Sequence, residues 1–212
     1  MVYLKISALR PWLFLIIYVI KEYDIYMLDK WIISMLKIVL LSVFFSAHGV
    51  ATEVVSGEFE LVDHNGNLVT QSTYSNKLRL VFFGFTRCPI ICPTTMSEIS
   101  KVMSLLGERS HQVQPIFISI DPDYDTPETV ADYISIFHPS IVGLTGTPDQ
   151  TKRAANSYNV TYGKGPVNSM GYAEEIYHTS YLYLMDRNGD LLDLIGYGAK
   201  PKVILDKMKE YL

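Results

Sequence analysis

The two cysteines of this 212-residue chain, Cys88 and Cys92, lie between a strand-like segment and a helix-like one. Leu80 to Phe85 is almost continuously apolar, as expected of a strand that is covered on both faces. From Met96 to Leu106 the apolar residues recur at helical spacing, and the pattern stops at Gly107. The sequence therefore predicts a strand, a turn that holds both cysteines, and a helix.

Each cysteine is followed by a proline, which disfavours helical backbone angles in the residue before it. We therefore expect the helix to begin at Pro93, with Cys92 as its N-cap residue. Unpaired backbone N–H groups and the positive end of the helix dipole favour a thiolate at that place. This predicts a reactive pair with lowered pKa values. The nucleophile stays open, because Cys92 has the better dipole position whereas Cys88, earlier in the motif, is usually the more exposed of such a pair.

Three interpretations of the cysteine pair are open from the residues alone. A structural disulfide across so short a loop would stabilise the fold by only about 2 kcal/mol in chain-entropy terms. Thiol–disulfide exchange and the binding of one soft metal ion both use two neighbouring sulfurs. The short spacing therefore favours a reactive or metal-binding pair over a structural disulfide.

The composition suits a globular domain that follows a leader. Hydrophobic residues make up 49% of the chain, which is enough for a core. The net charge is −4, and the sequence has no long basic run and no recognisable nucleic-acid motif. We expect one folded domain over residues 52–212 and no binding to nucleic acid.

Residues 1–51 have the features of a leader. From Met35 onward the sequence has a short positive start, an apolar run from Ile38 to Ala47 and small residues near Ala51, which is the layout of a secretory signal peptide. We predict export and a mature chain that begins near Thr52, with an uncleaved N-terminal anchor as the alternative. Either leader places the domain in the periplasm or on the outer face of the inner membrane, and membrane contact is expected only through an uncleaved leader.

The other patterns give the expected order of elements. A hairpin is predicted from Phe59 to Thr70, because Asn65-Gly66 is a strong two-residue turn signal. Further along we expect a strand at 116–120, a helix from 126 that ends before 139, an inserted helix from 147 to about 158, an exposed loop over 163–177, strands at 180–185 and 191–197, and a last helix near 204–212. This order predicts a thioredoxin-like α/β fold with an N-terminal β-hairpin extension and an inserted helix.

Four segments resemble the Sco/SenC family of copper chaperones for cytochrome oxidase: FFGFTRCPIICP, ISIDPDYDTPE, VGLTGTPDQ and HTSYLYLMDRNGDL. They occur in the family's order and extend the resemblance over roughly residues 56–212. The resemblance implies that Cys88, Cys92 and His178 bind copper as Cu(I), Cu(II) or both. Thiolates select Cu(I) and imidazole suits both oxidation states, so this set of ligands is chemically reasonable.

The resemblance implies a metallochaperone that delivers copper to the CuA-bearing subunit of cytochrome c oxidase. Another copper chaperone or a thiol reductant is a further expected class of partner. The alternative is an enzyme, a thiol–disulfide oxidoreductase in which Cys88 and Cys92 form the redox-active pair, and a peroxidase-like activity is a third option. Whether the protein is an enzyme therefore stays open at this point.

Two departures from the family's pattern change the charge around the thiolates. Arg87 stands where the family commonly has histidine or another residue, and Ile90-Ile91 stands where it often has an acid. We expect Arg87 to stabilise the thiolates, and the loss of an acid removes a like-charge penalty.

A third departure concerns the histidine. Tyr177 stands where the family often has an acid just before His178. Without that acid, another hydrogen-bond partner has to fix the tautomer of the His178 ring, and Glu174 or Glu175 is a candidate.

The acids Asp121, Asp123 and Asp125 alternate as in a calcium loop. The segment fails as an EF-hand, because Thr126 stands where glycine is required and no glutamate ends the loop. We expect these acids to shape a turn and to cap the helix that begins at Pro127, with a role beside the cysteines as the alternative.

Overall fold

The computed structural model describes residues 30–31, 34–35, 55–165 and 176–212. The chain divides into two compact units, residues 1–52 and 53–212, and all elements below belong to the second. The apolar run and the cleavage point of the predicted signal peptide lie outside the described residues, so the leader stays a prediction. Among the residues that are described, no helix is long and apolar enough to cross a membrane.

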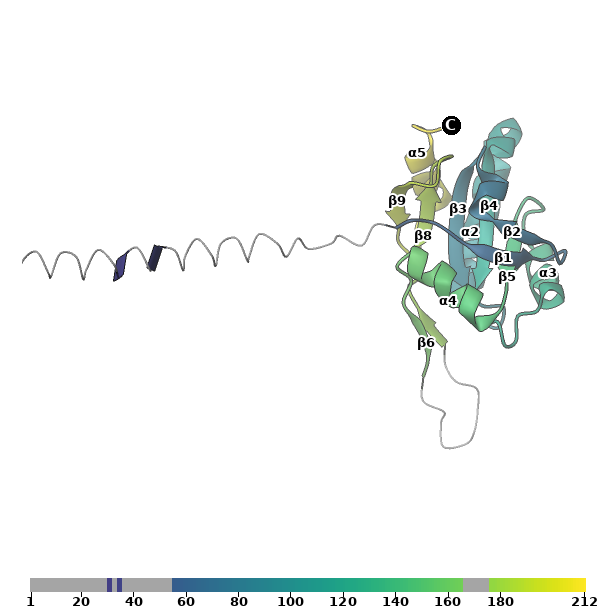
Figure 1. The fold of residues 1–212 in the computed structure, drawn as a ribbon. Helices are drawn as coiled ribbons and strands as arrows, with labels where there is room; N and C mark the ends of the chain where they lie inside the picture. Colours follow the sequence, from purple (N-terminus) through teal and green to yellow (C-terminus); the bar gives the residue numbers. More distant parts are fainter. Residues whose placement is uncertain (1–29, 32–33, 36–54, 166–175) are drawn as a thin grey trace, which may run out of the picture. The chain divides into compact units, whose positions relative to one another are not determined.

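A seven-stranded sheet with the order β2-β1-β5-β4-β3-β8-β9 forms the centre of the second unit (Figure 1). Strands β3, β4 and β5 are parallel, whereas β8 pairs antiparallel with β3 and β1 pairs antiparallel with β5. The hairpin that Asn65-Gly66 predicts is present as β1 and β2. The strand bounds are β1 (Glu60–Asp63), β2 (Leu68–Thr70), β3 (Leu78–Gly84), β4 (Val113–Ser119), β5 (Val142–Thr145), β8 (Leu182–Met185) and β9 (Leu191–Ile195).

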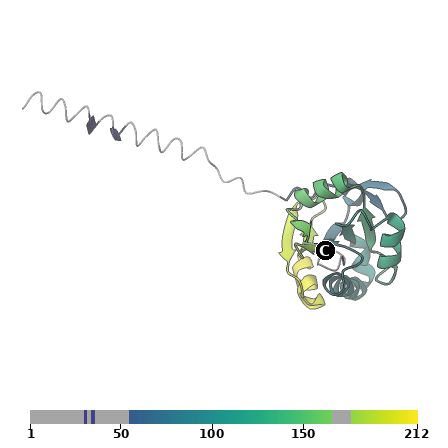
Figure 2. The ribbon, with the colours of Figure 1, turned by 90° about the horizontal axis from the view of Figure 1, so that it is seen from below.

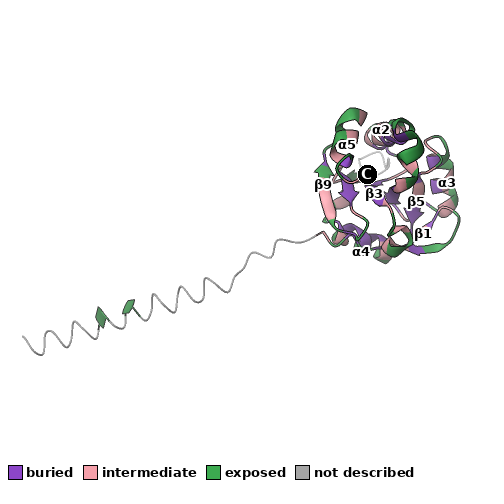
Figure 3. Ribbon diagram, turned by 90° about the horizontal axis from the view of Figure 1, so that it is seen from above, coloured by how far each residue is buried: buried purple, intermediate pink, exposed green. Residues whose placement is uncertain are grey.

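Helices cover both faces of this sheet. They are α2 (Ile91–Leu106), α3 (Pro127–Ser135), α4 (Pro148–Ser157) and α5 (Pro201–Met208), with 3-10 turns η2 (Gln71–Tyr74) and η3 (Gly107–Gln112). Buried residues of α2, α3 and α5 form one core with one face of the sheet, and those of α4 form a second core with the other. The views along the sheet show this separation, with α4 on one side and α2 and α5 on the other (Figures 2 and 3).

Strand β3 is buried over its whole length, as the continuous apolar run predicts. Leu80 and Phe82 belong to the core under α2, whereas Val81 and Phe83 belong to the core under α4. Side chains alternate across a strand, so a strand between two helical layers needs apolar residues at every position.

Three strands differ from the expectations. Strand β5 was not predicted, and it lies between β4 and β1 near the middle of the sheet. Strands β6 (Tyr162–Lys164) and β7 (Ile176–His178) pair antiparallel at the two ends of the predicted exposed loop. All three strands are short and contain glycine or polar residues, so their sequences carry little of the periodicity that marks a strand.

The topology brings three separate segments to one edge of the sheet. Gly84, the last residue of β3, pairs with Ser119, the last residue of β4, so the segments that follow both strands leave at the same edge. Phe82 pairs with Leu182, the first residue of the antiparallel β8, so the segment before β8 arrives at that edge too. The cysteine turn, the acidic loop and His178 are therefore neighbours in space.

Candidate metal centre

Helix α2 begins at Ile91 with Ile90 as its N-cap residue, so the predicted start at Pro93 is wrong. Cys92 lies inside the first turn and is fully buried, whereas Cys88 lies before the helix with 9% of its surface exposed. A proline is tolerated in the first turn because the first N–H groups of a helix have no partner within it. The restriction that Pro93 places on Cys92 was therefore weaker than expected.

The Cys88 sulfur takes the place that was predicted for Cys92. The backbone N–H of Cys92 donates to Cys88 Sγ at 3.4 Å. A hydrogen bond with the Cys92 side chain and the amides of Cys92, Ile90 and Ile91 outweigh burial and lower the pKa of Cys88 to about 5. The start of the helix therefore activates the cysteine that precedes it.

Cys92 behaves in the opposite way. Its hydrogen bond with Cys88 and its burial raise the pKa of Cys92 far above the usual range. Because the two thiols are neighbours, the first ionisation opposes the second, and the pair holds one proton at neutral pH. The prediction that both pKa values are lowered is therefore wrong. The two cysteines are not joined in a disulfide in this structure.

The Cys92 sulfur packs directly against the backbone of β3. A Cβ atom at Gly84 would lie 2.8 Å from Cys92 Sγ, closer than such atoms approach, and would make a tight contact of 3.0 Å with Cε2 of Phe117. Glycine at this position therefore makes room for the sulfur. A glycine inside an apolar strand signals a close approach of this kind, and the sequence FFGF carried that signal.

His178 lies in β7, and its Nε2 is 3.8 Å from Cys92 Sγ. Its Nδ1 is 2.9 Å from the carbonyl oxygen of Thr179. A carbonyl oxygen can only accept, so this contact assigns the proton of the neutral ring to Nδ1 and leaves the Nε2 lone pair directed at the cysteine. Thr179 thus fixes the tautomer of His178, which was the role expected of Glu174 or Glu175. Both glutamates lie outside the described residues.

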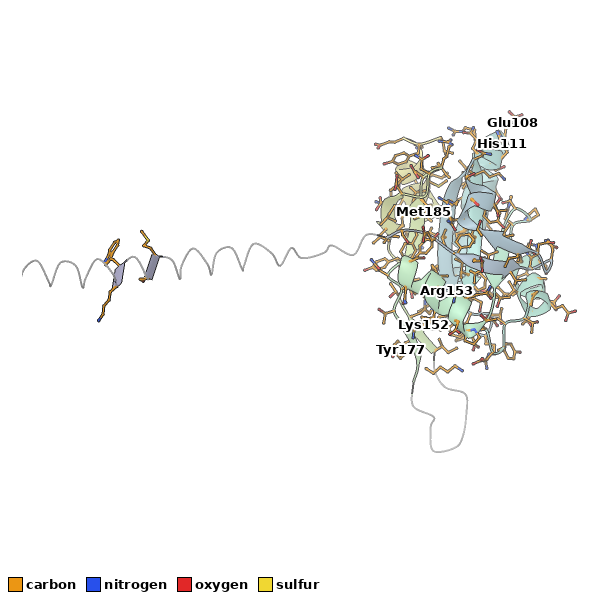
Figure 4. All side chains as sticks on the ribbon, in the orientation of Figure 1. Glu108, His111, Lys152, Arg153, Tyr177 and Met185 are labelled. Carbon is orange, nitrogen blue, oxygen red and sulfur yellow. The ribbon has the colours of Figure 1, made fainter. Side chains whose placement is uncertain are left out.

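Aromatic rings hold the His178 side chain in place. The ring packs edge-on against Phe82 and Phe85, with centroids 6.1 and 6.0 Å away. The neighbouring Tyr177 is exposed. Figure 4 shows Tyr177 at the end of the domain opposite to His111, so His111 does not contribute to this site.

Asp125 ties the acidic loop to the cysteine turn. Its buried carboxylate accepts hydrogen bonds from the Thr86 backbone N–H at 3.0 Å, the Thr86 hydroxyl at 2.6 Å and the Ser119 hydroxyl at 2.6 Å. The predicted helix cap is also present, where Thr126 Oγ1 accepts from the backbone N–H of Thr129 at 3.2 Å. The acidic loop therefore shapes a turn, as expected, and also fixes the residues that lead to Cys88.

The Arg87 side chain contacts the same acidic loop. It forms an ion pair with the buried carboxylate of Asp121 at 2.5 Å, and this pair raises the pKa of Arg87. The guanidinium also lies over the ring of Tyr124, 4.2 Å from the centroid. The pKa of Cys88 is set mainly by Cys92 and by neighbouring amides, and not by Arg87 as we expected.

The three predicted ligands thus come to the same edge of the sheet from three different places in the chain. Among the residues that the structure describes, no three His, Cys, Asp or Glu side chains are close enough together to hold a metal as they stand. The chemistry of the donor set still fits a soft ion, because it offers one thiolate, one thiol and one unprotonated imidazole nitrogen. The same two sulfurs also suit thiol–disulfide exchange.

Known proteins are similar to this chain in sequence and in fold. The SCO1/SenC family model matches residues 48–212. A SCO2-like protein of Rickettsia felis is 35% identical over 157 residues, which cover 73% of this chain and 76% of the relative. The mitochondrial protein SCO1 of Saccharomyces cerevisiae is 35% identical over 159 residues, which cover 74% of this chain and 54% of the relative.

Solved structures extend the comparison. The copper-bound structure of ScoI from Bradyrhizobium japonicum has a TM-score of 0.68 and 38% identity, and covers 74% of this chain and 99% of its own. The copper-bound structure of yeast Sco1 has a TM-score of 0.67 and 36% identity, and covers 74% of this chain and 87% of its own. These similarities confirm the predicted thioredoxin-like fold.

Proposed function

Because this chain belongs to the SCO1/SenC family, we propose that it binds a copper ion through Cys88, Cys92 and His178 and delivers it to the CuA-bearing subunit of cytochrome c oxidase. The observation that carries this proposal is the contact between Cys92 Sγ and the unprotonated Nε2 of His178, next to the sulfur of Cys88. The copper-bound structures of ScoI and yeast Sco1 support copper as the ion. The family's role in cytochrome c oxidase assembly supports the acceptor.

The protonation states suit the uptake of Cu(I). Cys88 is already a thiolate at neutral pH, and His178 presents a free lone pair on Nε2. Cys92 has to give up its proton to bind, so copper uptake releases a proton to solvent and is favoured by rising pH. A site with two sulfurs and one nitrogen is low-coordinate, and a ligand of the acceptor can approach the ion before a ligand of this protein leaves it.

The unequal pKa values favour a second candidate function, that of a thiol–disulfide oxidoreductase. The Cys88 thiolate would attack a partner disulfide, forming a mixed disulfide and releasing one partner thiolate. Cys92, after losing its proton, would attack the Cys88 sulfur, forming the Cys88–Cys92 disulfide and releasing the second partner thiolate. The partner gains two electrons and this protein loses them. An attacking cysteine of low pKa and a buried resolving cysteine suit this sequence of steps.

A transfer assay tests delivery against reduction. Copper-loaded protein would be mixed with the soluble, metal-free CuA domain of the same organism, whose cysteines have first been reduced. We expect copper, measured in each protein after the two are separated, to move to the CuA domain in proportion to the copper supplied, and not to do so with the Cys88→Ser variant. If the copper stays on this protein, and the metal-free protein instead reduces an oxidised CuA domain catalytically, the oxidoreductase is the better description.

A further inference from the structure

A pocket lies between the start of helix α2 and the loop that joins β9 to α5. The two helices are neighbours on one face of the sheet (Figure 3). Leu182 of β8, Ile195 of β9 and Ile204 of α5 give the pocket apolar walls. Its empty space, including the part that is open to solvent, is about 290 Å³. Apolar walls with a few polar groups among them are the usual make-up of a ligand pocket.

This pocket adjoins the candidate metal centre. Thr95, which lines the pocket, follows Cys92 by three positions in helix α2. Ser180 also lines it, and the Ser180 hydroxyl donates to the carbonyl oxygen of His178 at 3.2 Å. Two of the three predicted copper ligands are therefore within a few residues of the pocket, and a protein that docks at this edge to exchange copper would cover the pocket too.

Glu98 is the acid of this pocket, and one of its oxygens has no hydrogen-bond donor. Oε1 accepts from Nζ of Lys101 at 3.1 Å, and the lysine side chain is 60% exposed. Oε2 is buried, and no residue that the structure describes donates to it, although the Glu98 side chain is only 14% exposed. A buried carboxylate oxygen without a donor is destabilising, so a ligand that brings a donor into the pocket is favoured.

The serine and threonine hydroxyls of the pocket already donate their protons to the backbone. Those of Thr94 and Thr95 donate to carbonyl oxygens four residues earlier in the chain, at 2.7 and 3.0 Å. The hydroxyl of Ser180 donates to His178, as described above. A hydroxyl has one proton and two lone pairs, so each of these three groups can only accept a further hydrogen bond. Together with Glu98 they form a set of acceptors, which fits a group that carries several donors.

We propose that this pocket receives an arginine side chain of the protein that accepts copper from Cys88, Cys92 and His178. The inference rests on the proposed function, because it names how that acceptor docks. The N–H groups of a guanidinium match a set of acceptors, its charge pairs with Glu98, and its aliphatic stem lies along the apolar walls. Tyr197 also lines the pocket and is 49% exposed, so its ring is available to stack on the cation.

The pocket is tested without copper and without the acceptor. N-acetyl-arginine amide would be titrated into the reduced, metal-free protein while the backbone amide signals are followed by NMR. We expect saturable shifts at Thr95, Gly196 and Gly198, and none with N-acetyl-citrulline amide, in which a neutral urea group replaces the guanidinium. Glu98→Gln should weaken binding of the arginine compound by about tenfold, because the charge of the acceptor is lost.

Glu108→Gln is the matched control. It removes the same charge from an exposed residue at the end of the domain opposite to Tyr177 (Figure 4), so it should leave the titration unchanged. The docking role is measured in the transfer assay with the CuA domain. There Glu98→Gln should slow copper transfer by about tenfold while its affinity for Cu(I) equals that of the wild type, and Glu108→Gln should change neither quantity.

The opposite results decide against the inference. Equal binding of the arginine and citrulline compounds, or an unchanged titration in Glu98→Gln, would mean that water satisfies the free oxygen, and would overturn it. Transfer from Glu98→Gln at the wild-type rate would overturn the docking role. A wild-type protein that passes no copper to the CuA domain refutes the proposed function, whereas the arginine titration still decides whether the pocket binds a guanidinium.

Discussion

Cys88 and Cys92 have the same side chain and lie four positions apart, yet their surroundings set opposite protonation states. Cys88 precedes helix α2 and receives its free amides, whereas Cys92 is buried in the first turn beside a sulfur that is already charged. The residues alone identified the cause, a helix start that favours a thiolate. They assigned it to the wrong cysteine, because the helix begins at Ile91 and not at Pro93.

Alkylation of the reduced protein measures this difference. Cys88 has its pKa lowered to about 5, so the reactive thiolate is present above that pH and is lost as the pH falls through it. We expect the rate of modification by iodoacetamide, followed by mass spectrometry between about pH 4 and about pH 8, to have its midpoint near 5 and to label Cys88. In Cys88→Ser the buried Cys92 should react slowly. A midpoint near about 8.5, the value of an ordinary thiol, would contradict the assignment.

At the scale of the elements, the sequence is informative where one pattern persists over many residues. The apolar run of β3 and the helical spacing of α2 are long, and both were predicted. Strand β5, with the four residues VGLT, and β7, with the three residues IYH, are too short to show a period. The position of His178 follows from the pairing of β8 with β3, a long-range contact that local patterns do not contain.

The close contact between β3 and α2 gives a prediction at this scale. Gly84→Ala places a methyl group where Cys92 Sγ and Phe117 already lie, so the strand and the helix must separate. We expect the free energy of unfolding, measured with urea, to fall by about 1–3 kcal/mol, together with weaker binding of copper. Gly196→Ala is the control, since nothing lies within 4 Å of its added Cβ and it should cause neither change. Equal stabilities of the two variants would count against the packing described here.

At the scale of the whole molecule, the fold makes a site from residues that are distant in the chain. The parallel crossover through α2 and the antiparallel return into β8 bring Cys88, Cys92 and His178 to one edge of the sheet. The order of elements was sufficient to predict the thioredoxin-like fold. The contact between residues 92 and 178 was expected only from the family resemblance, because nothing in the local sequence joins them.

The leader is the other property of the whole chain. We infer that the domain is exported, because the segment from Met35 to Ala51 has the layout of a signal peptide. Mass spectrometry of the native protein should find an N-terminus near Thr52. A chain that starts before Met35 would show that the leader is retained, and would favour the membrane anchor.

Titration of the reduced domain with Cu(I) against a coloured competitor ligand tests the central claim most directly. The account predicts tight binding of one equivalent by the wild type, and loss of that binding in Cys88→Ser, Cys92→Ser and His178→Ala, with each variant still folded by circular dichroism. Wild-type binding no tighter than that of an ordinary dithiol, or an unchanged affinity in His178→Ala, would contradict a copper site built from these three side chains.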